Sequence, residues 1–282
     1  LEKNFNVEEG YISKRTGINI RYYKKEESIC EMAYKASKNA IETSKIDVKD
    51  IGLIIVATTS TNTLMPGISY YIQEKLNIEK CICLDILAGC AGFVNAFDIA
   101  KLYIDAKKVE KALIVGVDVL SECTDDNDIN TKIILSDGAG ATIISRTEKD
   151  KLYFSNIQSD GKNGEILTCR TNEKIKMDGK AIYKYAVTET VKNIEELLEQ
   201  ANVKIEDIKY VIPHQSNIKI MKSIATKLNI SMDKMYTNIS EVGNTSCTSI
   251  PVALTQMYEK KLLKDGDKTI LIGYGGGRNT AS

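Results

Sequence analysis

The feature that most constrains the fold of this chain is an internal repeat. The segments KIDVKDIGLIIVATTS (45–60) and NVKIEDIKYVIPHQS (202–216) share a charged loop that ends in Asp-Ile and runs into a strand-like stretch, which aligns Asp50 with Asp207. KALIVG (111–116) matches KTILIG (268–273) at the same offset of 157 residues, and KLNI recurs at 75–78 and 227–230 at an offset of 152. A register held over most of both halves indicates two copies of one unit.

Hydrophobic periodicity predicts the same order of elements in each copy: helix, strand, helix, strand, helix, strand. This alternation predicts mostly parallel sheets with helices on their faces, so the fold class is α/β, and two fused copies should form α/β/α/β/α layers about a pseudo-twofold axis. We expect an N-terminal half (1–148) and a C-terminal half (149–282) in one body, because no Pro-rich or Gly/Ser-rich linker separates them. Helices are predicted at 29–43, 66–76, 91–106, 181–200, 217–228 and 247–262, and strands at 53–57, 81–84, 113–117, 210–212, 235–238 and 269–272.

The two ends of the sequence carry signals of their own. It starts without Met, and LEKNFNVEEG carries charge where a signal peptide needs an apolar run. No apolar stretch reaches membrane-spanning length, so we expect a protein that is neither secreted nor embedded in a membrane. The sequence ends on GGGRNTAS, after which we expect no strand, and we therefore expect segments to be missing at both ends.

Composition narrows the range of partners. The 38 basic and 38 acidic residues cancel, so no global field attracts nucleic acid or an anionic membrane, and any basic docking site must be local. Seven cysteines without framework spacing predict reduced thiols in the cytoplasm. Cys81 and Cys83 form the one close pair, whose alternation is typical of one strand face, and we expect no metal site there.

Cys90, in LDILAGCAGF (84–93), is a candidate nucleophile. It lies between a strand-like run and a helical pattern, where unpaired helix N–H groups should lower the pKa of the thiol. The alternative is a small core residue, since cysteine is often buried. The 157-residue offset aligns Cys90 with Cys247, so the two turns should face a shared axis.

Three further motifs lie at predicted strand ends or turns. His214, the one histidine, ends the strand-like run of VIPHQSN, at the edge of an α/β sheet where ligands gather. Asn244, in EVGNTSCTSIP, precedes a predicted helix and could equally be a helix cap. GYGGG (273–277) could serve only as a tight turn, or it could let backbone N–H groups approach an oxyanion.

Together, CAGF, VIPHQSN, GNTS and GYGGG, in this order, resemble the thiolase-fold condensing enzymes, most closely the 3-oxoacyl-[acyl-carrier-protein] synthase III family. KRTGINIR (14–21), VATTSTN (56–62), LSDGAGA (135–141) and SDGKNGEILT (159–168) look like further family motifs. The resemblance covers nearly the whole chain. It implies a cytoplasmic homodimer that joins an acyl-CoA primer to malonyl-acyl carrier protein (malonyl-ACP), giving 3-oxoacyl-ACP, CoA and carbon dioxide, with no cofactor besides these substrates.

The resemblance also implies roles for individual residues. Cys90 would be the acyl-accepting nucleophile of a Cys-His-Asn triad with His214 and Asn244, and the N–H groups of Cys90 and Gly276 would form the oxyanion hole. His214 and Asn244 would then stabilise the carbanion formed by decarboxylation. Elongating synthases of this fold need a second histidine, and thiolases need a cysteine where Tyr274 stands. Chalcone-type synthases and other acyl-CoA-using relatives stay open.

Other positions carry over from the family to substrate binding. Tyr11 would stack on the CoA adenine, whose other face is often covered by an arginine, while this sequence has Ile129 there. Arg278 stands where the family has an apolar residue, which leaves the local chain path open. The remaining assignments are Arg15 and Thr16 beside the nucleotide; Gly179, Tyr183 and Asn217 along the pantetheine tunnel; Leu135, Met177 and, across a dimer interface, Met65 in the acyl pocket; and Lys219, Lys222 and Lys227 for docking of the acidic carrier protein, or else as a solvated helix face.

Two rival functions remain at this level. A Cys-His-Asn thioester hydrolase would admit water to the acyl-cysteine, and a non-catalytic protein would keep the fold and bind only a nucleotide or partner. The intact set of three residues argues against the second.

Overall fold

The computed structural model describes residues 1–61, 63–147 and 152–282. The predicted boundary between the halves, at 148/149, lies outside the described residues. The helices are α1 Tyr11–Thr16, α2 Ile29–Ser44, α3 Ile68–Lys75, α4 Gly92–Asp105, α5 Ile129–Lys132, α6 Gly179–Ala201, α7 Ile218–Lys227, α8 Ile239–Val242 and α9 Ser249–Glu259. The strands are β1 Ile51–Ala57, β2 Ile82–Ile86, β3 Lys111–Asp118, β4 Gly138–Ser145, β5 Ile157–Ser159, β6 Leu167–Thr168, β7 Lys176–Met177, β8 Tyr210–Pro213, β9 Thr269–Gly275 and β10 Asn279–Ala281.

Two four-stranded sheets form the frame of the molecule. Both are mixed: the first is mostly parallel, as predicted, whereas the second is mostly antiparallel. In the first, of order β2-β1-β3-β4, β1 pairs in parallel with β2 and β3, and β4 is antiparallel to β3. In the second, of order β5-β10-β9-β8, β8 and β9 are parallel, and β10 is antiparallel to both β9 and β5. The carboxyl ends of β2, β3, β8 and β9 carry residues that build the site described below.

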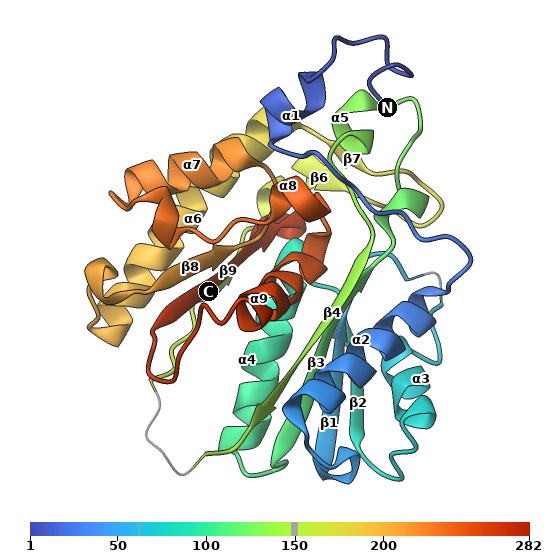
Figure 1. Cartoon of the computed structure of the whole chain (residues 1–282), viewed down its shortest axis with the longest axis vertical. Helices are drawn as coiled ribbons and strands as arrows, with labels where there is room; N and C mark the ends of the chain where they lie inside the picture. Colours follow the sequence, from blue (N-terminus) through green and yellow to red (C-terminus); the bar gives the residue numbers. More distant parts are fainter. Residues whose placement is uncertain (62, 148–151) are drawn as a thin grey trace.

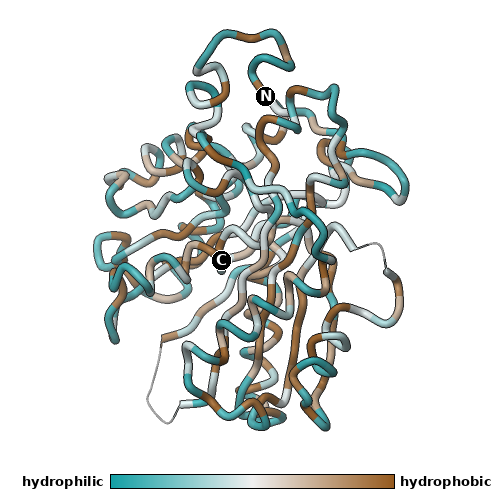
Figure 2. The backbone as a smooth tube through the Cα atoms, turned by 45° about the vertical axis from the view of Figure 1, so that its right-hand side comes forward, coloured by the Kyte–Doolittle hydropathy of each residue, from teal (hydrophilic) through white to brown (hydrophobic). Residues whose placement is uncertain are grey.

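Helices cover both faces of both sheets, which gives the five expected layers (Figure 1). Helices α2 and α3 pack on the outer face of the first sheet, and α6 and α7 on the outer face of the second. Between the sheets lie α4 and α9, whose apolar residues share one core with β1, β3 and β8. The hydrophobic colour in Figure 2 follows the central strands, because these are covered on both faces.

Local sequence signals set the ends of the helices. Ser28 accepts a hydrogen bond from the Glu31 N–H at the start of α2, and Asp178 accepts two at the start of α6. Asn202 ends α6 in the left-handed conformation, at φ 50°. These caps explain why the predicted helix limits agree with the observed ones to within a few residues.

The repeat predicted from the sequence maps onto the structure. The 3₁₀ turn Gly89–Ala91 before α4 and the 3₁₀ turn Ser246–Thr248 before α9 are separated by the same offset of 157 residues. A Cβ added at Gly92 would lie 3.5 Å from the Cβ of Cys247, so the two turns meet between the sheets, as expected.

Two predictions about strands are wrong. Residues 235–238 form no strand, because the side chain of Gln215 donates a hydrogen bond to the carbonyl of Tyr236 and accepts one from the N–H of Asn238. Only a single β-bridge, between Met235 and Val211, is left there. A strand, β10, does follow the glycines; its residues are buried and pair with β9 and β5. Hydrophobic periodicity cannot show that the side chain of Gln215 will bond to the backbone in place of a strand. It also cannot show a strand as short as β10.

Candidate active site

Cys90 lies in the turn between β2 and α4, with β9 against it. A Cβ added at Gly275 would come within 2.8 Å of the Cβ of Cys90 and 3.0 Å of its sulfur. Only glycine at position 275 therefore lets β9 approach the thiol this closely. The close approach also puts the N–H of Gly276 against the Cys90 sulfur, where it donates a hydrogen bond.

The thiol of Cys90 is partly accessible from a cavity but lies deep in the protein, and burial raises its pKa to about 11. The Ser246 hydroxyl, which donates to the sulfur at 3.4 Å, acts in the opposite direction, as do the N–H groups of Gly276 and Cys90. The Asp118 carboxylate adds to the increase. The sequence-based expectation of a lowered pKa is therefore wrong, because desolvation of the whole turn outweighs the local N–H groups.

The cavity above Cys90 has a volume of about 540 Å³. Its wall includes Asn244 and Gly276, and also Leu135 and Met177, the two residues predicted to line an acyl pocket. Further apolar side chains in the wall are those of Leu87, Leu120, Ile134, Leu167 and Ile175. The structure thus brings the nucleophile, an amide, a glycine N–H and an apolar surface together around one space large enough for a small thioester.

Asn244 follows α8 and is fixed on both sides. Its backbone N–H donates to the carbonyl of Ile134, and its carbonyl accepts from the N–H of Ser136 at 2.8 Å. Its side-chain Oδ1 accepts the N–H of Ser246 at 2.9 Å. Asn244 is not the N-cap of α9, which is Thr248, but its oxygen is occupied by the turn before that helix, so the NH₂ group is the part of this side chain that can donate to a ligand.

His214 follows β8 and is only 1% exposed. Burial lowers its pKa to about 3, so the imidazole is neutral at physiological pH. Its Nδ1 lies 2.8 Å from the Ser249 hydroxyl, which also donates to the carbonyl of Ser246 at 2.9 Å, and the ring packs edge-on against Tyr274. His214 is therefore joined to the Cys90 turn through two serines.

Sequence reasoning missed three residues of this site: Ser246, Ser249 and Asp118. Ser246 and Ser249 both lie in the motif EVGNTSCTSIP, two and five residues after Asn244, but this spacing alone does not indicate a function for either serine. Asp118 ends β3 fully buried, where its carboxylate accepts the Thr59 N–H at 2.6 Å and the Cys247 thiol at 3.1 Å. A lone acidic residue at the end of an apolar strand is the signal that could have found it.

The residues predicted to bind the nucleotide and pantetheine lie around α1, α6 and α7. The Arg15 guanidinium lies 4.7 Å from the centre of the Tyr11 ring, and Thr16 is buried with its hydroxyl bonded to the carbonyl of Ile12 at 2.7 Å. The Asn217 side chain accepts the N–H of Lys219 at the start of α7 and lies 3.4 Å from the carbonyl of Arg15. These contacts hold α1 against the start of α7.

The remaining predicted positions are more exposed. Tyr183, on α6, shares a hydrogen bond of 2.6 Å with Ser223 of α7, and Gly179 begins α6 with open space where a Cβ would be. Met65 is 83% exposed and belongs to no wall of the cavity above Cys90. The three lysines are exposed on α7.

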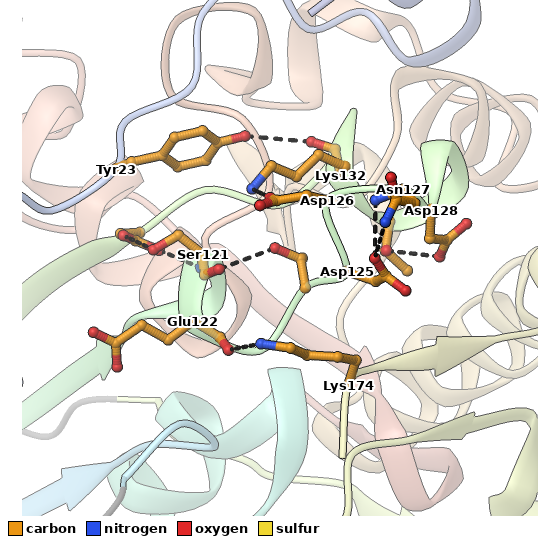
Figure 3. A network of polar contacts seen from close by, with 12 residues as sticks. Tyr23, Ser121, Glu122, Asp125, Asp126, Asn127, Asp128, Lys132 and Lys174 are labelled. Carbon is orange, nitrogen blue, oxygen red and sulfur yellow. Dashed lines mark hydrogen bonds and ion pairs between the residues drawn. The ribbon is translucent and has the colours of Figure 1, made fainter. Parts of the chain in front are cut away.

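A network of polar contacts, drawn in Figure 3, joins Tyr23, the segment 121–132 and Lys174. Lys174, between β6 and β7, donates to the carbonyl of Glu122 at 2.7 Å. Lys132 forms an ion pair with Asp126 at 2.6 Å, and the Tyr23 hydroxyl donates to the carbonyl of Lys132 at 3.3 Å. Residues of the same segments line the cavity, so this network fixes part of its wall.

Two kinds of feature are absent from the described residues. No group of three or more His, Cys, Asp or Glu side chains there could hold a metal ion. Among these residues, no helix combines the length and the apolar character that crossing a bilayer requires.

Comparison with known proteins adds to this geometry. The family model "3-Oxoacyl-[acyl-carrier-protein (ACP)] synthase III" matches residues 84–161, and the model of its C-terminal part matches residues 198–282. Curated relatives with the name beta-ketoacyl-[acyl-carrier-protein] synthase III include one from Clostridium beijerinckii, 39% identical over 96% of this chain and 88% of that protein. Another, from Clostridium novyi, is 37% identical over 98% of this chain and 90% of that protein.

Solved structures show the same similarity. The crystal structure of 3-oxoacyl-[acyl-carrier-protein] synthase III from Aquifex aeolicus superposes with a TM-score of 0.95 at 35% identity, over 98% of this chain and 90% of that one. The enzyme from Thermus thermophilus gives a TM-score of 0.93 at 27% identity, over 99% and 92% of the two chains. Both share the thiolase-like arrangement of two fused halves that the repeat predicted.

Proposed function

This chain belongs to the 3-oxoacyl-[acyl-carrier-protein] synthase III family, and on that premise we propose that it condenses an acyl-CoA primer with malonyl-ACP. The products are 3-oxoacyl-ACP, CoA and carbon dioxide. The protein is thus an acyltransferase that begins fatty acid synthesis. The observation that carries the proposal is the partly accessible Cys90 thiol beside a cavity, with the Gly276 N–H against its sulfur.

In the first half-reaction, Cys90 attacks the thioester carbon of acyl-CoA. The bond from sulfur to the acyl carbon forms, the bond from that carbon to the CoA sulfur breaks, and the thiol proton ends on CoA. The N–H groups of Cys90 and Gly276 hold the oxyanion of the tetrahedral intermediate. The close packing of Gly275 against Cys90 supports this assignment, since it keeps the neighbouring N–H near the reacting carbon.

In the second half-reaction, malonyl-ACP loses carbon dioxide and the resulting carbanion forms a bond to the acyl carbon. The bond from that carbon to the Cys90 sulfur breaks, and the released sulfur takes a proton from solvent. His214 and Asn244 donate hydrogen bonds to the thioester oxygen, where negative charge develops. A donor for this step must keep its proton, and the lowered pKa of buried His214 suits a neutral donor. Its Nε2 carries that proton when the Ser249 hydroxyl turns from the carbonyl of Ser246 and donates to Nδ1 instead. The amide of Asn244 serves for the same reason, since its Oδ1 is already bonded to the Ser246 N–H.

The substrates enter, we propose, past α1, α6 and α7. Tyr11, Arg15 and Thr16 bind the CoA nucleotide, and the pantetheine arm passes Gly179, Tyr183 and Asn217. Leu135 and Met177 bound the acyl group. The exposed lysines 219, 222 and 227 of α7 attract the acidic carrier protein.

Two further proposals concern the working protein. Each half-reaction balances with Cys90 and the two substrates, so no separate cofactor is required. The seven cysteines are all free, which supports a reducing compartment such as the cytoplasm. We also propose a homodimer in which Met65 reaches the acyl pocket of the partner subunit.

Mass spectrometry of a mixture with acetyl-CoA and malonyl-ACP tests the function. We expect one acetyl mass on the protein with acetyl-CoA alone, and 3-oxoacyl-ACP with carbon dioxide when both substrates are present. A thioester hydrolase would release acetate from the acylated protein and form no new carbon–carbon bond. A binding protein without activity would leave both substrates intact.

A further inference from the structure

Ser246 adopts a backbone conformation that favours glycine. Its φ is 53°, in the left-handed region. The repeat aligns it with Gly89, whose φ is 57°, so the same turn is made by glycine in the first half and by serine in the second. Glycine would adopt this conformation without strain, so the presence of serine here indicates a role for its side chain.

The contacts of Ser246 reach every member of the proposed triad. Its hydroxyl donates to the sulfur of Cys90 at 3.4 Å, and its N–H donates to Oδ1 of Asn244 at 2.9 Å. Its carbonyl accepts the hydroxyl of Ser249, which lies 2.8 Å from Nδ1 of His214. Ser246 also lines the cavity above Cys90, so its hydroxyl lies where the thioester reacts.

We propose that Ser246 is a further catalytic residue, whose hydroxyl stabilises the Cys90 sulfur as it becomes an anion and attacks the thioester. The inference rests on the proposed function, because it requires Cys90 to be the nucleophile. Ser246 keeps its own proton throughout. The bonds made and broken are those of acyl transfer from CoA to Cys90, and the proton lost from the Cys90 thiol ends on the sulfur of CoA.

The surroundings of the sulfur explain why such a donor is needed. Burial and the carboxylate of Asp118 both raise the pKa of Cys90, and the neighbouring Cys247 and Tyr274 are acids that add no positive charge. His214 is neutral. The hydroxyl of Ser246 has the largest effect among the groups that lower this pKa, ahead of the N–H of Gly276. Without it, the anion would depend on backbone N–H groups alone.

Two substitutions separate this role from a structural one. Ser246→Ala removes the hydroxyl and keeps the strained Cβ, whereas Ser246→Gly removes both. Iodoacetamide serves as the probe of the anion, with alkylation followed on the Cys90 peptide by mass spectrometry across pH. A hydrogen bond to a charged group has an effect of tenfold or more, so in both variants we expect alkylation at least about tenfold slower at a fixed pH. The pH profile should move by about one unit towards alkaline pH.

The unfolding midpoint distinguishes the alternatives. We expect Ser246→Gly to be at least as stable as Ser246→Ala, because glycine relieves the backbone strain. Alkylation of Cys90 should still be slow in this variant, because the anion has lost the hydroxyl that donates to it. Asn202→Gly is the matched control: it relaxes another left-handed residue, at φ 50°, and should leave the profile unchanged.

An unchanged pH profile in Ser246→Gly overturns the inference, and this variant decides the matter if Ser246→Ala does not fold. A shifted profile in a protein that acetyl-CoA cannot acylate would show that Ser246 stabilises the Cys90 anion, but it would reject the proposed function and with it the catalytic role of Ser246.

Discussion

At the scale of single residues, Cys90 and Cys247 occupy equivalent places in the repeat and have opposite surroundings. The Cys90 sulfur borders the cavity and accepts hydrogen bonds. Cys247 is 1% exposed, and its thiol donates to the Asp118 carboxylate at 3.1 Å and to the carbonyl of Ala57 at 3.2 Å. Burial and the nearby carboxylate raise its pKa well above the usual value, so it stays a thiol.

Substitution of each cysteine by alanine should therefore have different effects. Cys90→Ala should abolish acylation by acyl-CoA, because no other nucleophile faces the cavity in the proposed mechanism. Cys247→Ala should keep acylation and lower the free energy of unfolding by about 1 to 3 kcal/mol, since a buried carboxylate loses a donor. Intact-protein mass and chemical denaturation measure the two effects. An acyl mass on Cys90→Ala, or its loss in Cys247→Ala, would show that the nucleophile was assigned to the wrong half.

Asn244 should act mainly on the second half-reaction. Asn244→Ala removes the NH₂ donor, so decarboxylation of malonyl-ACP should fall roughly a hundredfold to a thousandfold, while acyl transfer to Cys90 continues. Single-turnover assays of labelled acyl transfer and of carbon dioxide release separate the steps. Equal loss of both steps would mean that Asn244 holds the site together through its bond to the Ser246 N–H instead.

At the scale of elements, the turn after β9 depends on Arg278, which departs from the family pattern. Arg278 has φ 46°, its guanidinium lies 4.9 Å from the centre of the Tyr185 ring, and it forms an ion pair with Asp160. The N–H of Asp160 donates to the Arg278 carbonyl at 3.3 Å. These contacts fix the turn that begins at Gly276, and they answer the question that the sequence left open about the chain path here.

Loss of this anchor should reach the oxyanion hole. Arg278→Ala should slow the acylation of Cys90, by less than the roughly hundredfold loss caused by removing an oxyanion donor outright, because the Gly276 N–H is displaced and not deleted. Arg146→Ala, which breaks an exposed ion pair with Glu110, is the matched control and should leave the rate unchanged. Single-turnover acylation measures both variants. Equal rates in wild type and Arg278→Ala would show that the turn keeps its shape without the arginine.

At the scale of the whole molecule, one side of the first sheet has features of an interface. Strand β2 is an edge strand with apolar residues, so its free backbone groups can pair with a second copy. Nearby in sequence, Leu64, Met65 and Leu87 are 95%, 83% and 75% exposed. Apolar side chains this exposed favour a partner surface of the same kind, as the proposed homodimer supplies.

The dimer can be tested by sedimentation. We expect the wild type to sediment at about twice the chain mass of 31.3 kDa, and Leu64→Glu combined with Leu87→Glu to shift the protein towards a monomer, because two charges would have to be desolvated. Tyr258→Glu, at a similarly exposed position on α9, should remain dimeric. A wild type that sediments as a monomer at micromolar concentration would reject the proposal.

The sequence by itself determined the duplicated α/β plan. The periodicity of hydrophobic residues depends on neighbours a few residues apart, so it predicted the six longest helices and five of the six proposed strands, and it missed the short helices α1, α5 and α8. Because parallel strands end at one edge of a sheet, the same pattern brought out Cys90 and His214 as candidates. The resemblance then supplied their roles, and the comparisons confirmed the family and its reaction.

Only the tertiary structure decided the chemistry around the sulfur. The pKa of Cys90 depends on its burial and on the carboxylate of Asp118. The role proposed for Ser246 depends on its hydrogen bond to the Cys90 sulfur, 156 residues away in the sequence. Likewise, the side chain of Gln215 forms the hydrogen bonds that a neighbouring strand would form with residues 235–238. Arg278 pairs with Asp160, 118 residues away in the sequence. Burial and long-range partners are set by the packing of all layers together, and no local pattern in the sequence encodes them.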